Sequence, residues 1–217
     1  EFAAALAKAN VLFIPGGFSG ADEPDGSGKF ITSFLRNEAI SVELMKLLNE
    51  RDGLVAGICN GFQALIKLGL LPYGEIGVQK ENSPTLTFNN IGRHQSKLVR
   101  TKVCSTRSPW LKKASVGQIL TVPISHGEGR FVANTNDIDT MLENGQILTQ
   151  YVDFEGNPTM VIQFNPNGSS MAIEGILSPD GRILGKMGHS ERVGDNISKN
   201  VPGNKDQGLF DAGVRFF

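Results

Sequence analysis

The first third of the chain alternates between short apolar runs and a helical periodicity. Val11 to Ile14 and Leu54 to Ile58 are short apolar runs rich in branched residues, which is typical of buried strands. Between them, apolar residues recur at helical spacing from Ile40 to Leu48, and residues 64–68 continue as a helix after the second run. The order strand, helix, strand, helix predicts a parallel βαβ arrangement.

The pattern changes after Pro72 to an alternation of apolar and polar positions. This alternation predicts strands with one exposed face. Two apolar runs joined by Ser178-Pro179-Asp180-Gly181 predict a β-hairpin over residues 172–187. We expect the apolar end of the tail that begins at residue 193 to pack back on the domain. The other expected strands cover residues 86–88, 98–103, 119–124, 147–152 and 160–164.

Composition narrows the class of protein. The 217 residues are 40% hydrophobic, and 21 basic and 22 acidic residues leave a net charge of −1. These values suit one globular domain with a sizeable core and indicate neither a nucleic-acid partner nor a membrane partner. Two cysteines are too few for a disulfide framework, so we expect a reducing, cytoplasmic setting. Because the chain begins with Glu1, we expect a piece of a longer polypeptide.

A cysteine stands where the second predicted strand meets its helix. Gly57 and Gly61 bracket Cys59, which makes the stretch a cysteine counterpart of the G-x-S-x-G nucleophile elbow. Position at a helix N-terminus lowers a thiol pKa, because free N–H groups favour negative charge. The backbone N–H of Asn60 is placed to stabilise an oxyanion. The alternative is a small buried cysteine in a tight turn.

Two histidines compete for the role of base. A cysteine nucleophile needs a base to take its proton and a carboxylate to orient that base. His126 and His189 are each followed two residues later by glutamate, Glu128 and Glu191. Extended residues two apart share a face, so the residues alone leave both pairs open. Rigidity favours His189, because it ends a hairpin strand and His126 lies among glycines.

Other motifs add less. A zinc deaminase would need a C-x-x-C pair, but Cys59 and Cys104 are far apart, so we expect no metal site. The sequence contains no G-x-x-x-x-G-K-[ST] phosphate loop, so ATP would bind elsewhere. Pro15-Gly16-Gly17 follows the first strand and presents backbone N–H groups at the sheet edge where open α/β folds bind ligands. An ordinary turn is the alternative.

Five stretches together resemble the class I (triad) glutamine amidotransferases, and more closely the glutaminase domains of phosphoribosylformylglycinamidine synthases. These stretches are Pro15-Gly16-Gly17-Phe18-Ser19, Gly57-Ile58-Cys59-Asn60-Gly61-Phe62-Gln63, Pro123-Ile124-Ser125-His126-Gly127-Glu128-Gly129, Asn165-Pro166-Asn167-Gly168-Ser169 running into Ile173-Glu174-Gly175-Ile176, and Gly188-His189-Ser190-Glu191-Arg192. The resemblance implies a flavodoxin-like α/β fold with a mostly parallel central sheet flanked by helices and an antiparallel hairpin extension.

The resemblance also implies roles for particular residues. Cys59 would attack the side-chain amide of glutamine, and His189, held by Glu191, would protonate the departing ammonia. The backbone N–H groups of Gly17 and Asn60 would form the oxyanion hole. The residues expected to contact glutamine are Phe18, Gln63, Ser125 and His126.

Partners follow from the same resemblance. Ammonia would pass to a synthetase domain or subunit, which uses ATP and magnesium to convert formylglycinamide ribonucleotide to formylglycinamidine ribonucleotide. The glutaminase would need no cofactor of its own.

The resemblance also predicts the domain organisation. Residues 1–217 would be a single domain from the C-terminal part of a larger synthase, without the family's first strand and helix. The alternatives are another cysteine-nucleophile α/β hydrolase and an inactive interaction module.

Overall fold

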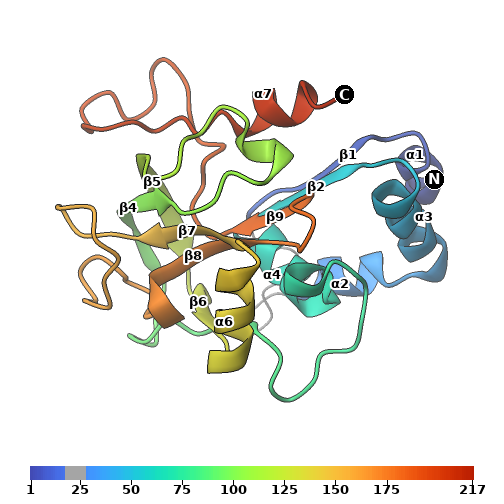
Figure 1. The fold of residues 1–217 in the computed structure, drawn as a ribbon, viewed down its shortest axis with the longest axis horizontal. Coiled ribbons are helices and arrows are strands. Elements are labelled where there is room, and N and C mark those ends of the chain that lie inside the picture. Colours follow the sequence, from blue (N-terminus) through green and yellow to red (C-terminus); the bar gives the residue numbers. More distant parts are fainter. Residues whose placement is uncertain (18–27) are drawn as a thin grey trace.

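The computed structural model describes residues 1–17 and 28–217 and has a mixed α/β fold (Figure 1). Its central sheet has the strand order β1-β2-β9-β8-β7-β4-β5, and β3 pairs with β6 in a separate small sheet. The helices in the described ranges are α1 (Phe2–Leu6), α2 (Lys29–Leu35), α3 (Glu38–Asn49), α4 (Asn60–Leu68), α5 (Leu70–Tyr73), η1 (Pro109–Leu111), α6 (Thr135–Glu143), η2 (Ser170–Ala172) and α7 (Leu209–Val214). The strands are β1 (Val11–Ile14), β2 (Leu54–Ile58), β3 (Thr85–Thr87), β4 (Gln95–Val103), β5 (Ile119–His126), β6 (Arg130–Val132), β7 (Ile147–Tyr151), β8 (Ile173–Leu177) and β9 (Ile183–Lys186).

The central sheet has a parallel part and an antiparallel part. Strand β2 runs parallel to β1 on one side and to β9 on the other. The predicted α/β class and the βαβ unit are therefore confirmed. From β9 onward, β8, β7, β4 and β5 pair antiparallel. The antiparallel part is thus larger than a hairpin, because β7, β4 and β5 extend the sheet beyond the predicted β8–β9 pair.

One predicted strand is wrong. Residues 160–164 contain no strand, and 162–164 form a turn in which the Val161 carbonyl accepts from the N–H groups of Phe164 and Asn165. The apolar run is also exposed, since Val161 keeps 55% and Ile162 48% of their accessible surface. Apolar residues alone were therefore a poor guide to a strand here.

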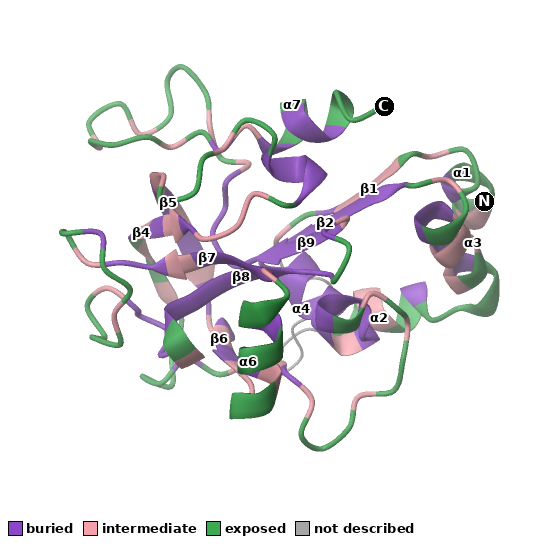
Figure 2. Ribbon diagram, in the orientation of Figure 1, coloured by how far each residue is buried: buried purple, intermediate pink, exposed green. Residues whose placement is uncertain are grey.

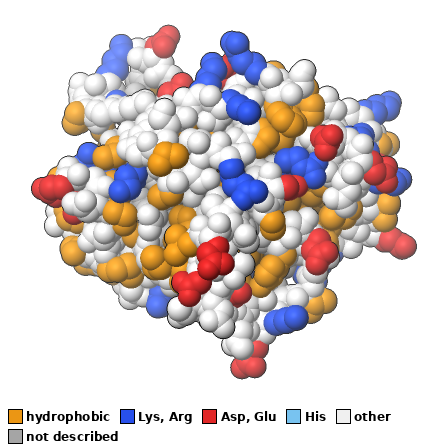
Figure 3. All heavy atoms as spheres, viewed as in Figure 1, with side chains coloured by type: hydrophobic (Ala, Val, Ile, Leu, Met, Phe, Trp, Pro, Cys, Tyr) orange, Lys and Arg blue, Asp and Glu red, His pale blue; other side chains and the backbone are white. Residues whose placement is uncertain are grey.

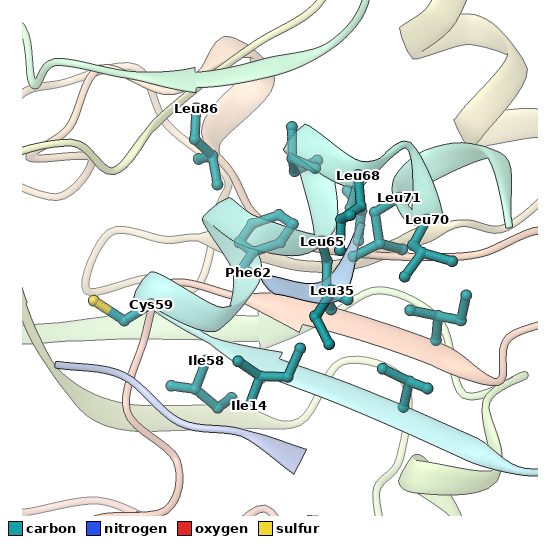
Figure 4. Packing of buried hydrophobic residues seen from close by; sticks show 14 of the residues in the cluster. Ile14, Leu35, Ile58, Cys59, Phe62, Leu65, Leu68, Leu70, Leu71 and Leu86 are labelled. Carbon is teal, nitrogen blue, oxygen red and sulfur yellow. The ribbon is translucent and has the colours of Figure 1, made fainter. Parts of the chain in front are cut away.

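Both faces of the parallel part are covered. Figure 2 shows the buried residues concentrated along the central strands and along α4. On one face α4 packs Phe62 and Leu65 into a large apolar cluster (Figure 4). On the other face Trp110 of η1 and Leu209 of α7 share a second cluster. The apolar tail therefore packs on the domain, as predicted.

The turn from β2 into α4 depends on close backbone approach at its two glycines. A Cβ atom on Gly61 would lie 2.1 Å from the Ile14 carbonyl oxygen, and one on Gly57 would lie 2.6 Å from the Gly61 carbonyl carbon. Both contacts are with backbone, which cannot rotate away. The glycine bracket is thus required by packing between β1, β2 and α4.

We expect Gly61→Ala to destabilise the chain by about 3 kcal/mol, because the added methyl group forces β1 away from α4. Urea unfolding followed by circular dichroism measures this change. Gly77→Ala is the matched control, since a Cβ atom there meets nothing within 4 Å and Gly77 has no positive φ. Equal stability of the two variants would contradict the packing argument.

Candidate active site

Cys59 lies at the junction of β2 and α4 with an unusual backbone conformation. Its φ of 54° and ψ of −106° are sparsely populated for a residue with a side chain. The residue is 5% exposed, and its sulfur points away from Phe62 and Leu65 (Figure 4). The predicted elbow is therefore present, and it turns the thiol away from the apolar cluster.

Gly16 brings the cysteine and a histidine together. A Cβ atom built on Gly16 would lie 3.1 Å from Cys59 Cβ and 2.5 Å from His189 Cε1. The bare glycine backbone therefore packs directly against both side chains. The Cys59 thiol also donates to the Ser125 carbonyl oxygen at 3.8 Å. The ends of β1, β2, β5 and β9 thus meet at one place.

His189 and Glu191 form a close pair. The Nδ1 atom of His189 lies 2.5 Å from Glu191 Oε1, and the His189 backbone N–H donates to the Pro123 carbonyl at 2.9 Å. The ring is 2% exposed, and in the described part of the chain its Nε2 atom has no hydrogen-bond partner. The carboxylate therefore fixes Nδ1, and Nε2 is left without a partner in a ring that packs against Gly16.

Burial dominates the electrostatics of the thiol. It raises the pKa of Cys59 to about 11, although the backbone N–H groups of Asn60 and Gly17 and the charge of Arg192 oppose the rise. The expectation of a lowered pKa at this helix start was wrong, because desolvation outweighs the helix terminus. Burial also tends to raise the pKa of Glu191, but the hydrogen bond with His189, its own backbone N–H and the charges of His189 and Arg192 together outweigh burial, and the pKa is lowered. The resting thiol is thus protonated beside an ionised carboxylate and needs a base.

We expect alkylation of Cys59 by iodoacetamide to accelerate about tenfold per pH unit between pH 7 and 10. A thiol with a pKa of about 11 stays mostly protonated over this range, and only the thiolate reacts. Mass spectrometry of peptides measures the rate at each cysteine, and the urea-unfolded chain supplies the reference. A rate at Cys59 that levels off near pH 8 would contradict the raised pKa.

The two backbone groups predicted to form an oxyanion hole lie beside the sulfur. The N–H groups of Gly17 and Asn60 are close enough to lower the pKa of the Cys59 thiol by hydrogen bonding. Gly17 has a φ of 125°, which L side chains rarely adopt. Asn60 is the first residue of α4, where backbone N–H groups point out of the helix start and are not used in the helix's own hydrogen bonds.

The residues predicted to contact glutamine have different surroundings. Phe18 lies outside the described residues. Ser125 places its carbonyl oxygen beside Cys59 Sγ. Gln63 is 3% exposed, and its Nε2 donates to the Glu128 carbonyl. The Gln63 side chain therefore ties α4 to the loop after β5.

His126 is the last residue of β5, where that loop begins. Its ring is 3% exposed and packs against Gly129, where a Cβ atom would lie 2.2 Å from the ring. Burial, together with the nearby His189 and His94, lowers the pKa of His126 to about 3. Within the described residues neither ring nitrogen has a hydrogen-bond partner. His126 is thus neutral at ordinary pH and, unlike His189, is not hydrogen-bonded to its glutamate.

Polar residues absent from the predicted site hold the loop in place. Asn89 donates to the His126 carbonyl at 2.8 Å and accepts from the Gly129 N–H at 3.1 Å. Asn167 and Ser169 both donate to the Gly129 carbonyl, at 2.9 and 3.3 Å. The Asn-Pro-Asn-Gly-Ser stretch carried the signal for two of them. Asn89 stood outside every motif, so only the fold reveals it.

Neither a metal site nor a membrane span is seen in the residues that the structure describes. Among residues 1–17 and 28–217, no three His, Cys, Asp or Glu side chains are grouped so that they could hold a metal ion. None of the helices in these ranges has the length and apolar character needed to cross a bilayer. On the face shown in Figure 3, acidic and basic side chains are interspersed.

Comparisons with known proteins agree with the motifs. Residues 2–217 match the family described as CobB/CobQ-like glutamine amidotransferase domain. The phosphoribosylformylglycinamidine synthase subunit PurQ of Aquifex aeolicus (strain VF5) is 34% identical over 197 residues, which cover 88% of this chain and 76% of that protein. PurQ of Methanococcus maripaludis (strain C7) is 36% identical over 197 residues, which cover 89% of this chain and 69% of that protein.

A solved structure agrees as well. The structure of PurLQS from Thermotoga maritima matches with a TM-score of 0.69 and 27% identity, over 95% of this chain and 79% of that chain. The predicted resemblance and fold class are thereby confirmed. The chain therefore belongs to the CobB/CobQ-like glutamine amidotransferase family, in the group formed by the PurQ glutaminases of phosphoribosylformylglycinamidine synthase.

Proposed function

We propose that the chain hydrolyses glutamine through a triad of Cys59, His189 and Glu191. One observation carries the proposal: the Cys59 side chain and the His189 ring pack against the same glycine, and Glu191 holds Nδ1 of that ring while Nε2 has no hydrogen-bond partner among the described residues. A nucleophile, a base and an orienting carboxylate are the three parts that acyl transfer from an amide needs.

The steps follow from these positions. Cys59 Sγ attacks the side-chain amide carbon of glutamine while its proton passes to His189 Nε2. The tetrahedral oxyanion is stabilised by the backbone N–H groups of Gly17 and Asn60. When it collapses, His189 returns the proton to the leaving nitrogen and ammonia departs. His189 then takes a proton from water, which hydrolyses the glutamyl thioester to glutamate and restores the thiol.

The raised pKa of Cys59 supports a mechanism in which a base removes the thiol proton. At a pKa of about 11 only about one thiol in ten thousand is ionised at pH 7, so attack depends on proton transfer to the histidine. His126 suits this role less well, because its pKa of about 3 makes it a poor proton acceptor at neutral pH. We propose that His126, Phe18, Gln63 and Ser125 line the glutamine pocket.

The ammonia would serve a synthetase. The PurQ relatives are named as subunits of phosphoribosylformylglycinamidine synthase, and the Thermotoga structure is of a PurLQS complex. By this relationship we propose that a synthetase domain or subunit, with its own ATP and magnesium, converts formylglycinamide ribonucleotide to formylglycinamidine ribonucleotide in the cytoplasm. The glutaminase itself needs no cofactor in the proposed steps.

A glutamine-analogue electrophile tests the proposal. We expect intact-mass analysis to show a single adduct on Cys59, suppressed by excess glutamine and absent in Cys59→Ser. The measurement is made on the chain alone and with its synthetase. Absence of labelling in both states would overturn the glutaminase assignment. Labelling that glutamine does not suppress would indicate a cysteine hydrolase with another substrate.

A further inference from the structure

A buried ion pair contacts the two residues that flank His189, the proposed base. Lys186 Nζ of β9 is 3.7 Å from Glu174 Oε2 of β8, and both side chains are fully buried. Glu174 Oε2 also accepts from the Thr149 hydroxyl. Lys186 Nζ also donates to Gln207 Oε1 at 3.0 Å. Neither charged residue belongs to the proposed triad or the proposed glutamine pocket.

Each partner of the pair holds one neighbour of His189. Glu174 Oε1 accepts from the backbone N–H of Gly188 at 2.5 Å. Lys186 Nζ donates to Ser190 Oγ at 2.7 Å. The residue before the histidine and the residue after it are therefore both fixed by the same pair.

Packing makes the first of these anchors rigid. A Cβ atom on Gly188 would lie 2.8 Å from Glu174 Oε1 and 2.7 Å from Val122 Cγ2. Gly188 is thus in close contact with both the carboxylate and β5. The second anchor extends into the C-terminal segment, because Ser190 Oγ also donates to Gln207 Oε1 at 3.0 Å.

Stability alone does not account for such a pair. Taking two charges out of water is costly, and replacing a buried ion pair with apolar residues of similar volume is often neutral or stabilising. Met or Leu side chains at these two positions would stabilise the fold about as well as the ion pair does. It does supply two directed hydrogen bonds at the strand end that carries the histidine.

We propose that Glu174 and Lys186 are positioning residues, which hold the His189 ring at the distance and angle that it needs to exchange a proton with Cys59. The proposal rests on the proposed triad. We call Glu174 and Lys186, with the hydrogen bonds that they make to Gly188 and Ser190, the clamp; Gln207 extends it to the C-terminal segment. The pair acts through Gly188 and Ser190 and does not touch the reacting atoms.

Two variants separate positioning from folding. In Lys186→Met the Glu174 carboxylate keeps its charge without its partner, and we expect the unfolding midpoint in urea to fall. In the double variant Glu174→Gln/Lys186→Met no buried charge remains, and the new amide oxygen can still accept from Gly188. We therefore expect the midpoint to recover, although the anchor on Ser190 stays lost.

The kinetic readout uses the glutaminase together with its synthetase. In the double variant we expect kcat for glutamine-dependent synthesis to fall about 10- to 100-fold, since small misplacements of a catalytic group have effects of this size. The KM for glutamine and the ammonia-dependent rate should stay within about twofold of the wild type. Ser190→Ala, which keeps the ion pair, should lower kcat similarly, with a smaller fall of the unfolding midpoint than in Lys186→Met.

The outcomes are distinct. If the double variant regains both stability and kcat, the pair only maintains the fold and the positioning role is overturned. His189→Ala is measured in parallel to test the triad itself. If it retains glutamine-dependent turnover, the triad and the clamp fall together. If it is inactive while the double variant and Ser190→Ala are fully active, only the clamp falls.

Discussion

Cys59→Ala is expected to lower glutamine-dependent synthesis by about four orders of magnitude or more, the size seen when the nucleophile of a catalytic triad is removed. Ammonia-dependent synthesis by the complete enzyme should continue, because ammonia made elsewhere bypasses the glutaminase step. The two rates, measured on the same preparation with saturating glutamine or ammonium, give the comparison directly. The expected result follows from the direct role of the sulfur in bond formation.

Cys104 supplies the matched control. It is the second cysteine of the chain, and burial raises its pKa to about 11 as well. Its Sγ lies at the end of β4, 3.2 Å from Gln150 Oε1, and not at the strand-to-helix turn. Cys104→Ala should leave both rates unchanged. If Cys59→Ala lowered both rates equally, Cys59 would be a structural residue, and the proposed mechanism would be wrong.

Local patterns were sufficient where structure depends on neighbours in sequence. Hydrophobic runs placed β1, β2 and the β8–β9 hairpin, and the glycine bracket placed the turn at Cys59. The helix α6 escaped prediction because it is mostly polar. Its start is fixed by Asn134, whose side chain accepts from the Asp137 N–H at 2.9 Å. Asn is a favoured residue at a helix start, but the apolar pattern of residues 135–143 was too weak to predict a helix there.

Properties that depend on distant residues were harder to predict. The helix start suggested an acidic thiol at Cys59, but burial by the converging strand ends reverses the direction of the pKa shift. The pairing of Glu174 with Lys186 was equally hidden, since one charged residue in each of two apolar strands does not show that the two side chains meet. The sequence also left two histidine–glutamate pairs open. Their different hydrogen bonding appears only when the chain after β9 meets the end of β5, where the His189 N–H donates to the Pro123 carbonyl.

Glu191→Gln is expected to lower kcat for glutamine-dependent synthesis by about 10²- to 10⁴-fold. The carboxylate accepts from Nδ1 of His189, which leaves Nε2 free to take the thiol proton, and its charge stabilises the imidazolium that forms. A neutral amide removes that charge and can hold the ring in the wrong tautomer. Because the pKa of Glu191 is lowered, the wild-type carboxylate stays ionised until the pH falls below its ordinary range. Any loss of wild-type activity between pH 6 and 7 should therefore come from another group.

Glu128→Gln decides between the two pairs that the sequence left open. Within the described residues neither His126 nitrogen has a hydrogen-bond partner, so Glu128 does not orient that ring as Glu191 orients His189. With a pKa of about 3, His126 also holds no proton to give to departing ammonia at neutral pH. Glu128→Gln should therefore change kcat by less than about tenfold, well short of the loss expected for Glu191→Gln. A larger loss in Glu128→Gln than in Glu191→Gln, at equal unfolding midpoints, would make His126 the base and leave His189 as a buried residue of the strand end.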